Sequence, residues 1–160
     1  MVLGMADMAY MVEALREAKI ALEEGNFPIG CVICLGRDII SRAHNQIIFP
    51  RRDRLAHAEL RALEQASPIL AKNKGRAVLY TTYEPCVMCF GAAMQSRIKK
   101  IISGANVDKS GAFCLIDSLP KFYRRANYIP ELVRGFMEDE CRALFMKSDL
   151  AKKLVKEGLI

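Results

Sequence analysis

The sequence predicts an α/β protein, a three-layer α/β/α sandwich with a mixed sheet of about five strands. Three observations indicate this fold: helical and extended patterns alternate along the 160 residues, two extended segments follow each other before the next helix, and 52% of the residues are hydrophobic. Alternation of this kind is typical of a sheet covered by helices. A chain of this length suffices for one core, so we expect residues 1–160 to form a single domain.

The first expected elements are a helix over residues 7–24 and two strands over residues 29–36 and 38–44. Apolar residues recur at helical spacing in the helix, and Gly25 stands where a C-terminal cap would. The strands, IGCVICLG and DIISRAH, are joined by a turn at residues 36–38. Because no helix separates them, we expect them to pair antiparallel.

The middle of the chain alternates regularly between helices and strands. A charged, proline-containing loop precedes a helix over residues 57–66, followed by a strand over 77–83, a helix over 86–96 and a strand over 99–105. Each of these strands is reached through a helix, which predicts parallel pairing.

The last part of the chain has a weaker pattern. From about residue 118 it is expected to be irregular, apart from a short strand within residues 131–135, until a last helix over 137–156.

Composition limits the compartment and the partners. The formal net charge of +6 is compatible with a polyanionic partner. The N-terminal residues lack a basic leader followed by an apolar run, and no stretch approaches the roughly 18 apolar residues of a membrane span. We therefore expect a cytosolic protein without membrane contact, whose six cysteines are thiols or metal ligands.

Two near-identical runs, CVIC at Cys31 to Cys34 and CVMC at Cys86 to Cys89, have the spacing of a metal or redox site. On a strand, residues three apart point to opposite faces, so Cys31 and Cys34 are expected in the core. At a helix N-terminus, residues three apart share one face, so Cys86 and Cys89 can bind one ion. The long separation of the two pairs argues against one four-cysteine zinc ribbon.

His57 and Glu59 indicate what kind of metal site this is. One imidazole from His57 and two thiolates leave a fourth tetrahedral position open, as in catalytic zinc sites, and H-x-E with P-C-x-x-C is the zinc deaminase signature. Positions two apart lie about 200° apart around a helix, so we expect His57 at or before the first turn. Glu59 is then free to act as the catalytic proton shuttle.

Two other classes of protein stay open at this point. A non-catalytic nucleic-acid-binding module would keep the zinc for structure, and a redox protein would form a reversible disulfide between Cys86 and Cys89. The intact Glu59 and the open fourth position favour an enzyme.

The runs NFPIGCVI, AHAELRAL and LYTTYEPCVMCFGAAMQSRIKKIISGA resemble the cytidine deaminase-like superfamily. They are most similar to the branch with bacterial tRNA adenosine deaminase, guanine deaminase and fungal-type cytosine deaminase. The resemblance implies hydrolytic release of ammonia from a purine or pyrimidine base or nucleoside, and a homodimer. It also implies one Zn²⁺ per chain, held by His57, Cys86 and Cys89, with Glu59 as the shuttle.

The resemblance further assigns substrate contacts to Asn45, Phe27 and the backbone of Ala58. Without it, Asn45 would be interpreted as a turn residue.

The choice between a small substrate and RNA is open. Our first hypothesis is that the substrate is a free base or nucleoside, and the alternative is an adenosine in a tRNA. Cations and interleaved aromatic residues, which favour RNA but are equally typical of solvated loops, are Arg51, Arg52, Arg54, Lys121, Arg124, Arg125, Phe122, Tyr123 and Tyr128. Two departures from the tRNA enzymes, the run DRLA before His57 and Val107 in place of an acidic residue, favour another substrate.

Overall fold

The computed structural model describes residues 3–50, 52–106, 110–125 and 128–159. Five strands form one sheet in the order β2-β1-β3-β4-β5, as expected for this fold class. The strands are β1 (Gly30–Leu35), β2 (Asp38–His44), β3 (Val78–Tyr83), β4 (Lys100–Ala105) and β5 (Glu131–Val133). The helices are α1 (Met5–Glu23), α2 (Ala58–Lys72), α3 (Val87–Gln95), η1 (Phe113–Ser118), α4 (Lys121–Arg125), α5 (Glu138–Phe145) and α6 (Asp149–Lys156).

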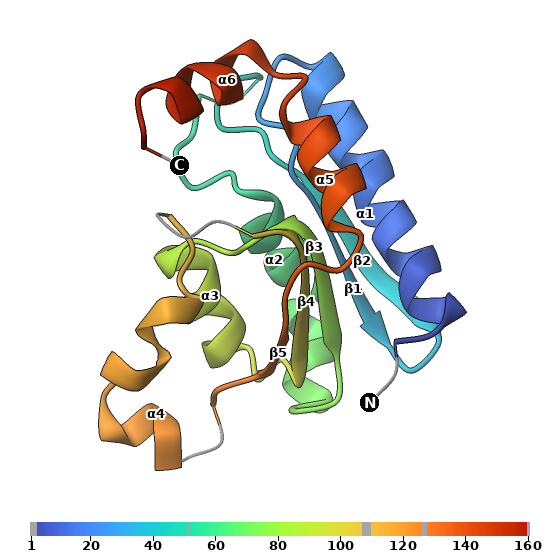
Figure 1. Ribbon diagram of the computed structural model, residues 1–160. Coiled ribbons are helices and arrows are strands. Elements are labelled where there is room, and N and C mark those ends of the chain that lie inside the picture. Colours follow the sequence, from blue (N-terminus) through green and yellow to red (C-terminus); the bar gives the residue numbers. More distant parts are fainter. Residues whose placement is uncertain (1–2, 51, 107–109, 126–127, 160) are drawn as a thin grey trace.

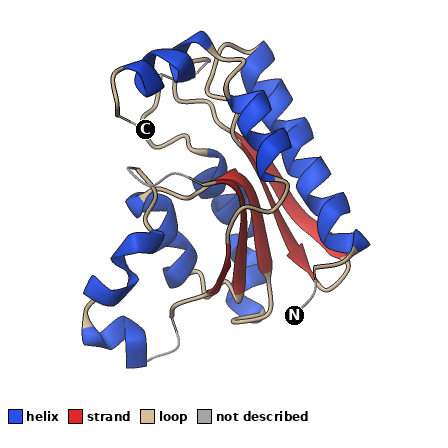
Figure 2. Cartoon of the chain, viewed as in Figure 1, coloured by secondary structure: helices blue, strands red, loops and turns tan. Residues whose placement is uncertain are grey.

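Helices cover both faces of the sheet, which gives the expected three layers (Figures 1 and 2). The larger core lies beneath α2 and α3 and includes Ile33, Leu63 and Phe90. The second core lies beneath α1 and α5 and includes Met11 and Cys141. None of the described helices is both long and apolar enough to span a membrane.

The pairing of the strands confirms one prediction and corrects another. β1 and β2 are antiparallel, as expected, and β3 and β4 are parallel. However, β3 pairs with β1, and this pairing is antiparallel. The crossover through α2 does return β3 in the direction of β2, but β3 adds to the free side of β1 rather than next to β2. A crossover through a helix thus determines that β3 runs parallel to β2, but it does not determine which strand β3 pairs with.

This order brings five chain segments to one edge of the sheet. β2, β3, β4 and β5 end at this edge, whereas the antiparallel β1 begins there. The segment before β1, the segment after β2 and the segment after β3 therefore meet, although they are up to about 60 residues apart in the sequence. Binding sites of open α/β sheets are usually found at such an edge.

The helix boundaries differ from the prediction where local capping or core packing decides them. α1 begins at Met5 because Asp7 Oδ2 accepts a hydrogen bond from the backbone nitrogen of Gly4 at 2.8 Å. α2 continues past Ala66 to Lys72 although it contains Pro68, which cannot donate within the helix. Burial of Leu70 in the core beneath α2 is the compensating interaction.

The C-terminal part is more helical than predicted. η1 and α4 occupy part of the segment expected to be irregular, and the single last helix is two helices, α5 and α6. The break lies at Ser148, which has an extended backbone and accepts a hydrogen bond from Ala151 N at 3.4 Å. A serine in this position starts a new helix.

Gly30 allows α1 to pack directly on β1. A Cβ atom at this position would collide with the carbonyl oxygen of Ala14 and lie 2.5 Å from the backbone nitrogen of Ala18. We expect Gly30→Ala to lower the free energy of unfolding by about 3 kcal/mol, because a helix backbone must move. Urea unfolding measures this, with Gly91→Ala as the control. Gly91 lies in α3, where an added Cβ atom would meet no other part of the described structure within 4 Å, so its substitution should be neutral or stabilising. Equal stability of the Gly30→Ala and wild-type proteins would contradict the packing argument.

Candidate active site

The three expected metal ligands meet at the edge described above. His57 Nδ1 lies 3.8 Å from Cys86 Sγ and 3.6 Å from Cys89 Sγ, and the two sulfur atoms are 3.6 Å apart. His57 and Cys86 are the N-cap residues of α2 and α3, both with extended backbone. Cys89 lies in the first turn of α3, on the same face as Cys86. The prediction that His57 stands just before its helix is confirmed.

The triangle of ligand atoms fits a tetrahedral zinc ion. Zinc lies about 2.3 Å from a thiolate sulfur and about 2.1 Å from an imidazole nitrogen, so two ligand atoms around it are roughly 3.6 to 3.8 Å apart. The three observed distances are in this range. Among the described residues, this is the one place where three side chains of the types His, Cys, Asp or Glu lie close enough to share an ion.

The protonation of the two thiols differs. The hydrogen bond between them, together with that from His57, lowers the pKa of Cys86 to about 4 although burial opposes ionisation. The same contact with Cys86 raises the pKa of His57. The bond to Cys86 and burial raise the pKa of Cys89 well above that of an ordinary thiol. One thiolate is therefore readily available, and a cation must compensate for the second.

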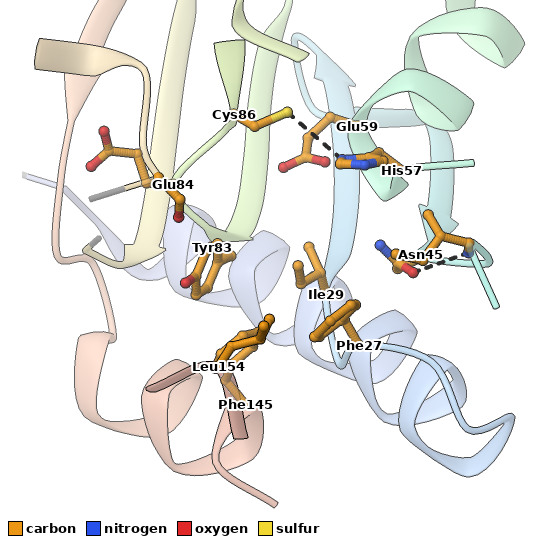
Figure 3. A pocket seen from close by; sticks show the side chains of 12 residues that line it. Phe27, Ile29, Asn45, His57, Glu59, Tyr83, Glu84, Cys86, Phe145 and Leu154 are labelled. Carbon is orange, nitrogen blue, oxygen red and sulfur yellow. Dashed lines mark hydrogen bonds between the residues drawn. The ribbon is translucent and has the colours of Figure 1, made fainter. Parts of the chain in front are cut away.

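Glu59 lies next to this triangle, between Cys86 and His57 in Figure 3. Its side chain is buried, and its Oε1 accepts a hydrogen bond from Thr81 Oγ1 on β3 at 3.0 Å. Burial raises the pKa of the Glu59 carboxyl above its usual value. Sequence reasoning missed Thr81, although strand alternation places it on the face that α2 covers.

A cavity of about 200 Å³ opens beside the triangle and is lined by the predicted residues His57, Glu59, Cys86, Asn45 and Phe27. Asn45 is buried, and its Oδ1 accepts from the backbone nitrogen of Ile47 at 3.2 Å, which leaves the amide nitrogen as a donor.

Ala58 and Cys89 are buried and do not line this cavity. Ala58 instead packs its side chain in the core beneath α2.

The cavity has walls that the sequence did not predict, and these are Ile29, Ile47, Tyr83, Glu84, Ser110, Phe145 and Leu154. The Phe145 ring stacks on Tyr83 at 4.5 Å between centroids and on Phe27 at 6.3 Å. Figure 3 shows Phe145 and Leu154 across the cavity from His57 and Cys86. Tyr83 and Glu84 precede the P-C-x-x-C run and could have been found from that position. Phe145 and Leu154 come from helices with no such motif.

The pair Cys31 and Cys34 lies in the core, as predicted. Cys31 packs in the core beneath α2 and α3, and Cys34 packs in the core beneath α1 and α5. Burial raises the pKa of both thiols. Their side chains therefore lie on opposite faces of the sheet and cannot share an ion.

Some cations and loop residues named above cannot be placed. Arg51 and Val107 lie outside the described residues, and the side chain of Arg125 is not described. The aromatic residues Phe122, Tyr123 and Tyr128 pack on one another through ring contacts of 5.3 to 5.6 Å.

Known proteins are similar to this chain in both sequence and fold. The MafB19-like deaminase family model matches residues 5–145. The tRNA-specific adenosine deaminase of Bacillus subtilis strain 168 is 38% identical over 159 residues, which cover 96% of this chain and 97% of the relative. A solved structure from a study of A-to-I editing by tRNA:A34 deaminases is 32% identical, with a TM-score of 0.72 over 86% of this chain and 99% of that one.

A more distant neighbour is the guanine deaminase of Bacillus subtilis. It is 31% identical, with a TM-score of 0.55 over 61% of this chain and 63% of that one. The family model matches from α1 to α5, the relatives are deaminases, and the solved structure has the same fold. The chain therefore belongs to the MafB19-like deaminase family and is a hydrolytic deaminase.

Proposed function

We propose that this deaminase holds one zinc ion through His57, Cys86 and Cys89 and that Glu59 is its proton shuttle. The fit of the ligand triangle to tetrahedral zinc supports the metal, and the adjoining cavity supports an open fourth position. Zinc held there would lower the pKa of a coordinated water to about 7, which makes a nucleophile available at neutral pH.

The residues of the chain then have distinct tasks. Glu59 takes the proton of the attacking water and delivers protons to the ring nitrogen and to the departing amine. Thr81 holds the carboxylate in place through its hydroxyl. The Asn45 amide donates to the base, and Phe27 covers one face of the ring. The backbone contact predicted for Ala58 is not part of this set, because Ala58 does not line the cavity.

We further propose that the substrate is an adenosine in the loop of a tRNA, which becomes an inosine with loss of ammonia. The observation that carries this proposal is the 38% identity, over nearly the whole of both chains, to a tRNA-specific adenosine deaminase. This is narrower than our first reading from the sequence, a free base or nucleoside, which the more distant likeness to a guanine deaminase keeps as the second candidate.

Exposed cations on two segments beside the cavity support an RNA substrate. The loop that joins Asn45 to His57 carries the exposed Arg52 and Arg54. α6 contributes Leu154 to the cavity and carries three exposed lysines within two positions of it in the sequence, Lys152, Lys153 and Lys156. Such cations bind phosphates without regard to base sequence.

Ammonia release distinguishes the substrates. The zinc-loaded protein is assayed with guanine, cytosine, cytidine, adenosine and an anticodon stem-loop RNA. We expect turnover of the stem-loop at a kcat/KM at least about a hundredfold above that of free adenosine, because binding energy from the phosphates is added. Turnover of a free base, with none of the stem-loop, would refute the tRNA proposal and favour the second candidate. RNA binding without turnover of any substrate would favour the non-catalytic module.

Two further expectations complete the proposal. Residues 1–160 act as one catalytic domain, and two copies associate as a homodimer, as the family resemblance implies. Light scattering of the purified protein checks the second statement.

A further inference from the structure

His44 lies between two carboxylates near the cavity, outside the set of residues used above. Its Nδ1 is 2.8 Å from Glu17 Oε2, and its Nε2 is 3.2 Å from Glu24 Oε2. The Gln46 Nε2 atom donates to Glu24 Oε2 at 3.3 Å and lies 3.1 Å from His44 Nε2. We call these four residues the His44 clasp.

The geometry of the His44 clasp favours the imidazolium form. A carboxylate can only accept, so both ring nitrogens must donate for both contacts to be hydrogen bonds. The Gln46 amide is compatible with this form because its Nε2 donates to Glu24 Oε2, so that this one carboxylate oxygen accepts from both Gln46 Nε2 and His44 Nε2. The ring is largely shielded, with 17% of the side chain exposed.

The charges around the ring agree with this. The hydrogen bond to Glu17 raises the pKa of His44 above its ordinary value, and Glu24 adds to the shift. Among the described residues, Glu17 and Glu24 are the titratable groups that face the ring. The neighbouring residue across the sheet is Gly30 of β1, which has no side chain.

The clasp joins the two segments that carry the predicted substrate contacts. Glu24 ends α1 and is followed, three residues later, by Phe27. His44 ends β2 and is followed directly by Asn45. Phe27 and Asn45 both line the cavity. A contact between Glu24 and His44 therefore fixes the distance between the two walls from just outside the site.

A second polar contact extends the same joint. The buried Asn26 donates from Nδ2 to Phe49 O at 2.8 Å, and its Oδ1 accepts from the backbone nitrogens of Ile48 and Phe49 at 2.9 and 3.0 Å. Asn26 thus ties the end of α1 to the loop after Asn45. With this neutral contact always present, the charge of the clasp is the part of the joint that can change with pH.

We propose that His44 is a positioning residue for the deamination reaction: as an imidazolium between Glu17 and Glu24, it holds the Asn45 segment against the Phe27 segment. When the ring loses its proton, one nitrogen becomes an acceptor and faces a carboxylate, so one hydrogen bond becomes a repulsive contact. Asn45 is then held less firmly, and substrate binding weakens. The chemical step at Glu59 does not involve the clasp.

The protonation of His44 is expected to set how KM depends on pH. The affinity is highest where His44 is protonated, below its folded-state pKa. KM should rise as the pH passes upward through that value, which is above the ordinary 6.5 of histidine. We expect a rise in KM of roughly fivefold, the effect of part of one charged hydrogen bond, with kcat changed by less than about twofold.

NMR measures the first part of the proposal on the wild-type, zinc-loaded protein. The chain has two histidines, so the imidazole signal that is lost in His44→Gln belongs to His44. Its titration should give a pKa above 6.5, and Glu24→Gln should lower this pKa. A His44 pKa at or below 6.5 would overturn the proposal.

Kinetics against pH test the second part, with whichever substrate of the ammonia assay is turned over best. A wrong tRNA proposal therefore leaves this test intact. His44→Gln should have a KM raised about fivefold at low pH and no step in KM at higher pH. Glu24→Gln should move the step to lower pH, in parallel with the NMR titration. Arg42→Gln is the control, since Arg42 lies on the same strand and pairs with Glu13 at 3.2 Å, away from the clasp.

Each outcome decides the proposal. A KM step that moves with the His44 titration supports it, even if His44→Gln does not fold, because Glu24→Gln carries the test alone. A step that stays in place in Glu24→Gln while the NMR pKa moves would refute it. Variants that lose thermal stability but keep the wild-type KM at every pH would reduce His44 to a structural role.

Discussion

Glu59→Gln is expected to lower kcat about a thousandfold while the protein keeps its metal. Glutamine has nearly the same shape as glutamate and can still contact Thr81, but it cannot take a proton from water or return one to the amine. General acid and base catalysis by one side chain contributes roughly a hundred- to ten-thousandfold. Turnover of the best substrate, and zinc content by atomic absorption, measure the two parts of this prediction.

A neighbouring glutamate provides the control for this experiment. Glu64 lies on the same helix, one and a half turns further on, and is exposed. Glu64→Gln should keep both zinc and activity. If Glu59→Gln retained full turnover, the shuttle would have to be another group. If it lost zinc as well, Glu59 would act on the metal site and the catalytic assignment would fail.

Cys86→Ala is expected to abolish tight zinc binding and with it the activity. Removal of one of the three protein ligands leaves two, Cys89 and His57. The negative charge of the Cys86 thiolate, which would balance part of the charge of the zinc ion, is also lost. We expect less than about one tenth of an equivalent of zinc after dialysis against a weak chelator, and activity at least about a thousandfold lower. The wild-type protein should hold one equivalent.

The twin run supplies a matched substitution. Cys34→Ala removes a buried thiol at the same spacing, and we expect about 1 kcal/mol lower stability with unchanged zinc content. Loss of zinc in Cys34→Ala would refute the assignment of the two runs. A reversible disulfide between Cys86 and Cys89 in the native, metal-free protein would instead favour the redox class.

Each of the two halves of the metal site was accessible from the sequence because its geometry is local. Cys86 and Cys89 are three residues apart at the start of one helix, and His57 and Glu59 are two apart at the start of another. Both arrangements depend only on where a helix begins. Pro85 and the preceding strand indicate the start of α3, and the charged loop before His57 indicates the start of α2. The opposite faces of Cys31 and Cys34 followed in the same way from strand alternation.

The walls of the cavity required the tertiary structure. Phe145 and Leu154 belong to helices separated by a break at Ser148, and nothing in their sequence points to a cavity. Whether they reach the site depends on how α5 and α6 pack. The sequence predicts one continuous helix over residues 137–156. An unbroken helix would extend Leu154 along the axis of α5 and not along that of α6.

The chemistry of this protein was thus determined by the sequence, and the shape around that chemistry by the fold. Thiol, imidazole and carboxylate spacings within one or two helical turns are set by backbone geometry that any chain shares. The insertion of β3 beside β1 instead decides which segments meet at the edge of the sheet, and so places His44, Asn45 and Phe27 together. Contacts of this kind join residues far apart in the chain, and their free energy depends on the packing of the whole sheet rather than on local spacing.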